Sequence, residues 1–158
     1  MVLCPRLQVL CGAWLVSFLS SVAAQTPDWI LTAHDNRVMR CTPSSPSITC
    51  TDLYANGRGS GPAQFAGPFE LDVGPDYFVV ADKENNRVQR CPLEGGGDCT
   101  TVVGGLNQPM FAEIRPTTGD LLVLDAGSRI QLCPPDGSSA CTTVASASAK
   151  HVAWSSSG

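Results

Sequence analysis

A five-residue unit that ends in cysteine occurs three times in this chain of 158 residues. The copies are Arg37–Cys41, Arg87–Cys91 and Arg129–Cys133, and they begin 50 and 42 residues apart. Each is followed eight or nine positions later by a second cysteine, at Cys50, Cys99 and Cys141. A period of this length is typical of propellers, solenoids and other arrays of one supersecondary unit. We therefore expect repeated copies of a small motif.

The second copy, residues 66–105, contains four segments with strand character. Phe69–Val73 alternates apolar and acidic residues, the pattern of a half-buried strand. Tyr77–Ala81 is a continuous β-branched and aromatic run, as in a strand covered on both faces. Arg87–Arg90 alternates again, and Thr100–Val103 follows the second cysteine. Short segments joined by polar turns predict a four-stranded antiparallel meander.

The other copies follow the same plan. In the third, residues 108–147, the expected strands are 110–114, 121–124, 129–132 and 142–145. The first copy, residues 29–57, begins at its second strand, Trp29–Thr32, and lacks the first. Residues 150–158 begin a further copy with one strand, His151–Trp154. No amphipathic helical pattern follows residue 24, so the predicted fold class is all-β.

The segment Val79–Gln89 holds an apolar strand, then Ala-Asp, a polar loop and Asn-Asn-Arg-Val, and it resembles the NHL-repeat family of β-propellers. The third copy keeps Leu124–Gln131 with a loop one residue shorter. The first keeps Asn36–Val38 and compresses the loop to His34-Asp35. The resemblance implies four-stranded antiparallel blades of a partial or open β-propeller.

The number of copies raises the question of closure. A closed propeller has about four to eight blades, whereas this chain holds about three. We expect either that C-terminal blades are missing or that the strand at 151–154 exchanges with a second chain, so that two chains close one ring.

The first 24 residues have the pattern of a signal peptide. Arg6 gives a short basic region, and Val9–Val22 is apolar and leads to small residues before Gln25. This run is too short to span a bilayer, which needs about 20 apolar residues. We expect a secreted array over residues 25–158, without a membrane span.

Six of the eight cysteines remain once Cys4 and Cys11 leave with the signal peptide. An even number at regular spacing in an exported chain predicts disulfides. The expected pairs are Cys41–Cys50, Cys91–Cys99 and Cys133–Cys141, each closing the outer hairpin of one copy. Zinc sites and redox-active dithiols favour closer cysteine spacing, so both alternatives are weaker.

Charge argues against two classes of partner. Arg6 is the one charged residue among the first 24, so nine cations and fourteen acids remain. An acidic chain disfavours non-specific nucleic-acid binding and polybasic attachment to membranes.

The recurring Arg37, Arg87 and Arg129 are the candidate binding residues, because one repeated position could line a surface for an anionic ligand. Alternatively, each pairs with a turn carboxylate such as Asp82 or Asp125 and fixes its hairpin. Residues that recur in every repeat usually build the repeat, which favours the structural interpretation.

Single acids in the turns, Asp35, Asp82 and Asp125, could suggest the channel calcium of propeller lactonases and lyases. Calcium takes about six to eight converging oxygens, whereas these acids occur one per copy. His34 and His151 accompany no nucleophile signature. We expect no catalytic residue, metal site or cofactor.

A propeller fold by itself does not determine function. The expected function is that of a secreted, disulfide-stapled module that binds a protein, peptide or glycan through its loops. The alternative is a fragment of a secreted lactonase-like or lyase-like propeller enzyme with a channel metal. In either case we expect Val80 and Val88, with the counterparts Leu124 and Ile130, to point into the spaces between blades.

Overall fold

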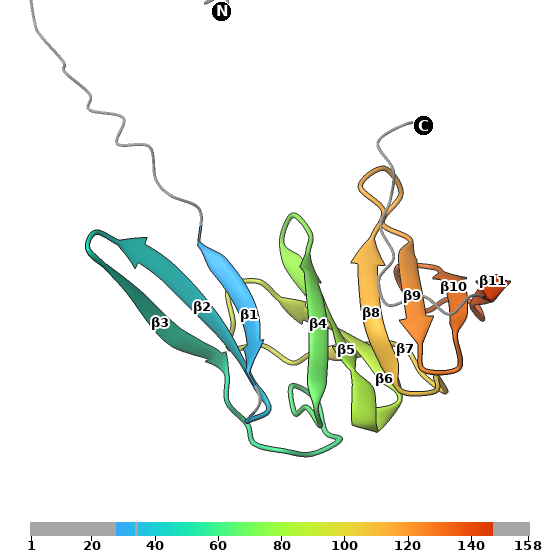
Figure 1. The fold of residues 1–158 in the computed structure, drawn as a ribbon, viewed down its shortest axis with the longest axis horizontal. Coiled ribbons are helices and arrows are strands. Elements are labelled where there is room, and N and C mark those ends of the chain that lie inside the picture. Colours follow the sequence, from blue (N-terminus) through green and yellow to red (C-terminus); the bar gives the residue numbers. More distant parts are fainter. Residues whose placement is uncertain (1–27, 34, 147–158) are drawn as a thin grey trace, which may run out of the picture.

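The computed structural model describes residues 28–33 and 35–146 and contains three antiparallel sheets (Figure 1). The first sheet comprises β1 (Trp29–Ala33), β2 (Arg37–Ser44) and β3 (Ser47–Tyr54). The second comprises β4 (Pro68–Val73), β5 (Tyr77–Asp82), β6 (Arg87–Pro92) and β7 (Thr100–Val103). The third comprises β8 (Pro109–Ile114), β9 (Leu121–Asp125), β10 (Arg129–Cys133) and β11 (Thr142–Ser146). A short 3-10 helix, η1 (Lys83–Asn85), joins β5 to β6.

Each sheet is a meander, because strands that follow one another in sequence are also hydrogen-bonded neighbours. The predicted all-β class is confirmed, and every strand predicted within the second and third copies overlaps an observed one. The first sheet has three strands and begins at the counterpart of β5, as expected. The predicted strand at 151–154 lies outside the described residues.

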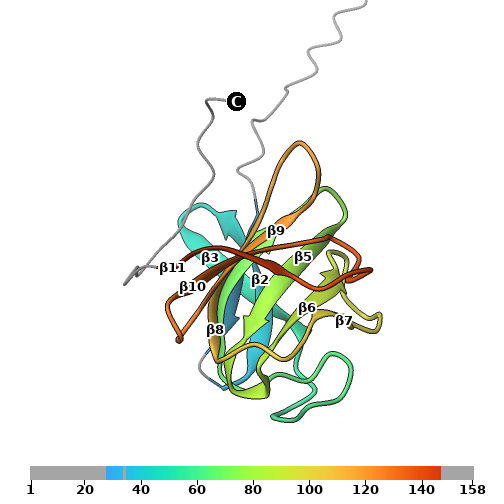
Figure 2. The same cartoon turned by 90° about the vertical axis from the view of Figure 1, so that its right-hand side faces the viewer.

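The three sheets stack face to face in chain order, and Figure 2 views this stack from the side of the third sheet. One buried cluster lies between the first and second sheets and includes Val38, Tyr54, Phe65, Phe78, Val80 and Cys91. A second lies between the second and third sheets and includes Val79, Ala81, Val88, Leu106, Ile114, Leu121 and Val123. Each sheet therefore covers its neighbour, and the connecting segments contribute Phe65 and Leu106 to the two cores.

The register corrects one predicted equivalence. Val80 pairs with Gln89 across β5 and β6, and Val123 pairs with Gln131 across β9 and β10. The counterpart of Val80 is thus Val123 and not Leu124. Successive strand residues point to opposite faces, so an error of one position assigns a side chain to the wrong interface. Val80 and Val123 both face the preceding sheet, whereas Val88 faces the following one.

The three disulfides join Cys41 to Cys50, Cys91 to Cys99 and Cys133 to Cys141, which are the predicted pairs. In the first copy the paired strands extend beyond the two cysteines. The β2–β3 ladder continues past the bridge to the pair Ser44 and Ser47, so this disulfide joins two paired strands. Alternating Thr and Ile residues around Cys50 suit a strand, which explains the longer hairpin.

Candidate functional site

A buried polar cluster surrounds Asp82 at the end of β5. The carboxylate has no exposed surface, and its Oδ2 accepts hydrogen bonds from Arg87 Nε at 2.8 Å and from Asn85 Nδ2 at 2.8 Å. Its Oδ1 accepts one from the backbone N–H of Ala66 at 2.7 Å. Burying a charge is tolerable only with such partners, so the cluster ties the turn before β6 to the segment before β4.

The segment between the first and second sheets completes this cluster. Arg87 donates from its terminal nitrogens to the carbonyl oxygens of Ser60, Gly61 and Gln64 at 2.8, 3.1 and 2.9 Å. Gln89 Nε2 donates to the same Gln64 oxygen at 2.8 Å. The Arg87 side chain is 12% exposed, so its hydrogen-bonding capacity is largely used within the protein.

The third sheet repeats the arrangement around Asp125. Arg129 Nε and Nη2 donate to Asp125 Oδ2 at 3.0 and 2.5 Å, and Gln131 Nε2 lies 3.3 Å from the same oxygen. Burial favours the neutral carboxyl, but the hydrogen bonds from the Arg129 side chain and from the backbone of Arg129 and Asn107 prevail. They hold the pKa of Asp125 below its usual value.

The first sheet departs from this pattern. Ala33 lies opposite Arg37, at the place where Asp82 lies opposite Arg87. Arg37 instead pairs with Asp35 at 2.7 Å and Asp52 at 2.9 Å. The hydrogen bond from Arg37 lowers the pKa of Asp35, and both carboxylates raise the pKa of Arg37.

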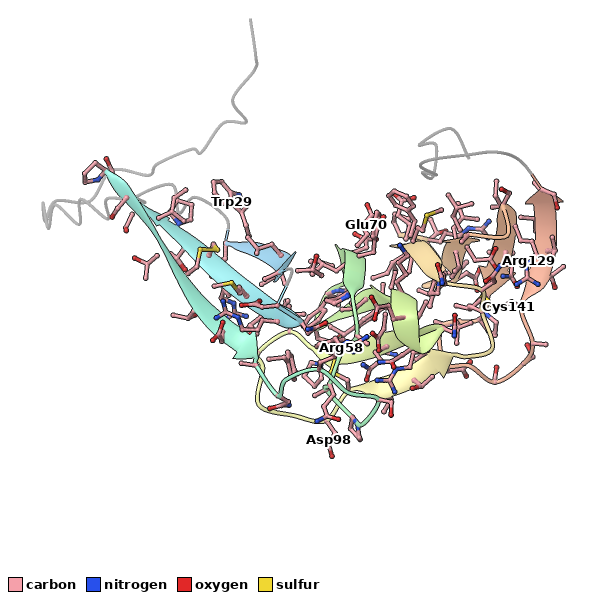
Figure 3. All side chains as sticks on the ribbon, turned by 60° about the horizontal axis from the view of Figure 1, so that its bottom comes forward. Trp29, Arg58, Glu70, Asp98, Arg129 and Cys141 are labelled. Atoms are coloured by element: carbon pink, nitrogen blue, oxygen red, sulfur yellow. A yellow bond between two sulfur atoms is a disulfide. The ribbon has the colours of Figure 1, made fainter. Side chains whose placement is uncertain are left out.

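The geometry favours the structural interpretation of the repeated arginines. Arg37, Arg87 and Arg129 lie on three different sheets, and each pairs with a carboxylate of its own sheet. The structure does not bring them together into one site. Arg129 lies at the end of the array opposite Trp29 (Figure 3).

A second repeated contact links each sheet to the next. Asn36 Oδ1 accepts a hydrogen bond from the backbone N–H of Gly67 at 2.9 Å, and Asn86 Oδ1 accepts one from Gln108 at 2.9 Å. Both asparagines have left-handed backbone angles, with φ of 66° and 57°. Ser128 occupies the same position in the third sheet with φ of 58°. Both asparagines belong to the motif that resembles the NHL repeat, and their role between sheets was not foreseen.

The candidate binding site is a hollow of about 480 Å³ between the first and second sheets. Its lining includes Thr32, Asn36, Arg58, Phe69, Lys83 and Glu84. Phe69 is 51% exposed, and Lys83 Nζ lies 5.4 Å from the centre of its ring. Phe111 of β8 packs edge-on against Phe69 at 6.1 Å. The hollow thus combines an accessible aromatic ring with a cation, two features that hold polar ligands.

Charged side chains form the rim of this hollow. Arg58 pairs with Glu84, and Figure 3 shows Arg58 near β4 between the first two sheets. The Thr32 hydroxyl donates to the carbonyl oxygen of Phe69 at 3.2 Å, which joins β1 to β4. Both neighbouring sheets therefore position the site.

A second hollow, of about 500 Å³, lies between the β4–β5 and β8–β9 turns. Its lining includes Asp72, Val73, Tyr77 and Arg115. Asp72 Oδ2 accepts a hydrogen bond from the backbone N–H of Ile114 at 2.8 Å, and Arg90 stacks on the Tyr77 ring at 3.7 Å. The Asp72–Ile114 hydrogen bond joins the second and third sheets, whereas the Arg90–Tyr77 contact lies within the second sheet. We therefore assign this hollow a structural role.

The hollow beside Phe69 was not predicted from the sequence. Phe69 was predicted only as a strand residue and Lys83 only as a turn residue, while Arg58 lies in a connecting segment without strand pattern. The signal that could have pointed to the site is the large aromatic residue at the start of the alternating segment Phe69–Val73.

Among residues 28–33 and 35–146, no group of three or more His, Cys, Asp or Glu side chains could hold a metal ion. Within the same residues no helix has the length and hydropathy needed to cross a bilayer. His34 and His151 lie outside this part of the chain. No protein-family model matches the chain, and no curated protein shows significant similarity to it.

Proposed function

We propose that the chain is an exported, disulfide-stapled module of the NHL-like propeller type, and that it binds a peptide, protein or glycan in the hollow beside Phe69. The blade interpretation is supported by three consecutive four-stranded or three-stranded meanders that stack face to face. Export is supported by the three disulfides, which persist in oxidising compartments.

The observation that carries the binding proposal is the exposed Phe69 ring next to Lys83. Large apolar side chains normally lose most of their exposed surface in a folded domain, yet about half of Phe69 remains accessible beside a hollow. Asn36 and Arg58 line it with N–H groups, and the Thr32 hydroxyl, which donates to the Phe69 carbonyl oxygen, can accept a hydrogen bond. Ligand sites commonly combine an apolar surface with a few convergent polar groups in this way.

The test is a screen of the secreted protein against peptide and glycan arrays, followed by titration of the strongest ligand. Phe69→Ala should weaken binding at least about two- to tenfold, because stacking on an aromatic ring contributes about 0.5–1.5 kcal/mol beyond area burial. Lys83→Ala should weaken binding of anionic ligands most.

The matched control is Val73→Ala, a change at a similarly exposed apolar residue of the same strand outside this hollow. Equal affinity of Phe69→Ala and wild type would exclude the hollow as the binding site.

A further inference from the structure

The two outer faces of the stack carry apolar residues at positions that are buried inside it. In register with the second sheet, Trp29 corresponds to Phe78 and Leu31 to Val80. Phe78 and Val80 have no exposed surface, whereas Trp29 is 50% and Leu31 is 36% exposed. The outer face of the first sheet therefore carries apolar residues at positions that a neighbouring sheet buries in the second sheet, but Trp29 and Leu31 remain exposed.

The outer face of the third sheet, at the opposite end of the stack, also carries an exposed apolar residue, Val144. Val144 of β11 corresponds to Val102 of β7, since each follows the threonine that pairs with the buried glutamine of the preceding strand. Val102 is 8% exposed and lies in the core between the second and third sheets. Val144 is 54% exposed. On the outer face of the third sheet, therefore, Val144 is exposed at a position that is buried in the second sheet, while Leu124 on the same face is buried.

The residues of the first sheet also do not require hydrogen bonds from a segment like residues 59–66, which connect the first sheet to the second. In the second sheet, Asp82 and Gln89 depend on backbone groups of the preceding segment, namely Ala66 N–H and Gln64 C=O. Their counterparts in the first sheet are Ala33 and Met39, which need no such partners.

Arg37 completes this adaptation. Arg87 relies on three carbonyl oxygens of the preceding segment, whereas Arg37 is neutralised by Asp35 and Asp52 of its own sheet. The outer face of the first sheet can therefore be covered by a sheet of a separate molecule without leaving a buried charge unpaired.

We infer that the outer face of the first sheet, marked by Trp29 and Leu31, docks on the outer face of the third sheet, marked by Val144, of a second copy of this chain. In both internal interfaces, the face of one sheet that points toward the C-terminal end of the stack packs on the face of the next sheet that points toward the N-terminal end. The contact between two copies joins the same two kinds of face. Such head-to-tail contacts form rings when the rotation closes. The described residues of two copies supply six sheets, within the range of about four to eight blades in closed propellers.

This contact differs from the exchange of strand 151–154, because it uses whole sheet faces and residues of β1 and β11. It goes beyond the proposed ligand binding and does not require the ligand. A monomeric variant that still binds the ligand would therefore leave the proposed function intact.

The test compares the molar masses of the disulfide-bonded secreted protein and two variants by sedimentation equilibrium across a concentration series. We expect wild type to be a dimer. Trp29→Glu and Val144→Glu should each be monomeric, because each change places a carboxylate in both contacts of the dimer. Val73→Glu, at an exposed residue of the middle sheet, should remain dimeric. Circular dichroism confirms that each variant is folded.

Mixing the two monomeric variants distinguishes head-to-tail from symmetric contacts. The intact first sheet of Val144→Glu can still bind the intact third sheet of Trp29→Glu, so the mixture should recover a dimer that is weaker than wild type. A monomeric wild type, a dimer that tolerates Trp29→Glu or Val144→Glu, or a mixture that stays monomeric throughout would each overturn the inference.

Discussion

Arg87 Nε lies 2.8 Å from Oδ2 of Asp82, a carboxylate without exposed surface. Three carbonyl oxygens of the preceding segment accept the remaining hydrogen bonds of the same guanidinium group. Arg87 thus compensates a buried charge and at the same time fixes the path of the chain between two sheets. Polar contacts of Arg87 should therefore contribute to the stability of the array as much as apolar packing between the sheets does.

Removal of Arg87 should be at least as costly as removal of a core side chain. Arg87→Ala leaves the Asp82 carboxylate buried and unpaired, which costs about 3–5 kcal/mol. Val88→Ala creates a cavity between the second and third sheets and should cost about 2–4 kcal/mol. Arg58→Ala, which breaks an exposed pair, should cost less than about 1 kcal/mol. Urea denaturation measures all three, and an Arg87→Ala effect as small as that of Arg58→Ala would contradict the role of the cluster.

The link between neighbouring sheets can be tested at Asn86. Asn86→Gly keeps the left-handed backbone accessible and removes the hydrogen bond to Gln108, so it should lower the free energy of unfolding by about 0.5–1.5 kcal/mol. Ser128→Gly is the matched control, because Ser128 has the same backbone conformation and the described residues include no inter-sheet hydrogen bond from its hydroxyl. Equal destabilisation by both changes would show that backbone flexibility, and not the hydrogen bond, is responsible.

Acid should weaken the third sheet through Asp125. Its pKa in the folded protein lies below the unfolded value of about 3.9, so the ionised carboxylate stabilises the fold above that value. This contribution is lost as the pH falls through the folded pKa. The difference in stability between wild type and Asp125→Asn should therefore be constant near neutral pH and shrink below about pH 4. A difference that grows on acidification would contradict the assignment.

The disulfides should contribute unequally. Each bridge closes a short loop and should contribute about 2–3 kcal/mol by constraining the unfolded chain. Replacing both Cys91 and Cys99 by alanine also removes buried sulfur from the core between the first two sheets. Replacing Cys41 and Cys50 should cost less, because Cys50 is exposed and the surrounding ladder remains paired. Thermal denaturation of the two double variants gives the comparison, and peptide mapping without reductant confirms the remaining bridges.

Local patterns predicted most of the fold. Alternation and β-branched runs located the strands, and the hairpin spacing identified the disulfide pairs. The pairing of Arg87 with Asp82 was also foreseen as one of two alternatives, because both residues recur at fixed positions. These features depend on neighbours within one copy, where sequence separation is small.

The contacts between copies could not be predicted in the same way. Ser60, Gly61 and Gln64 contact Arg87 through backbone carbonyl oxygens, which every residue carries, so no side-chain pattern marks them. The error at Leu124 was a shift of one position, since Val80 lies two residues before Asp82 and the residue two before Asp125 is Val123. The hollow beside Phe69 arises where two sheets meet and has no counterpart within a single copy.

Residues 59–66, which connect the first sheet to the second, also determine where a repeat unit begins that could be duplicated or transplanted as a whole. These residues supply hydrogen-bond acceptors for Arg87 and Asn85 and a donor for Asp82. A sheet excised at the start of β4 would therefore keep the Arg87–Asp82 pair but lose these backbone partners. A duplicated or grafted unit would have to begin near Gly59 to include the backbone groups that hydrogen-bond to Asn85 and Arg87. The boundary between repeat units therefore lies before Gly59, and not at Pro68, where β4 begins.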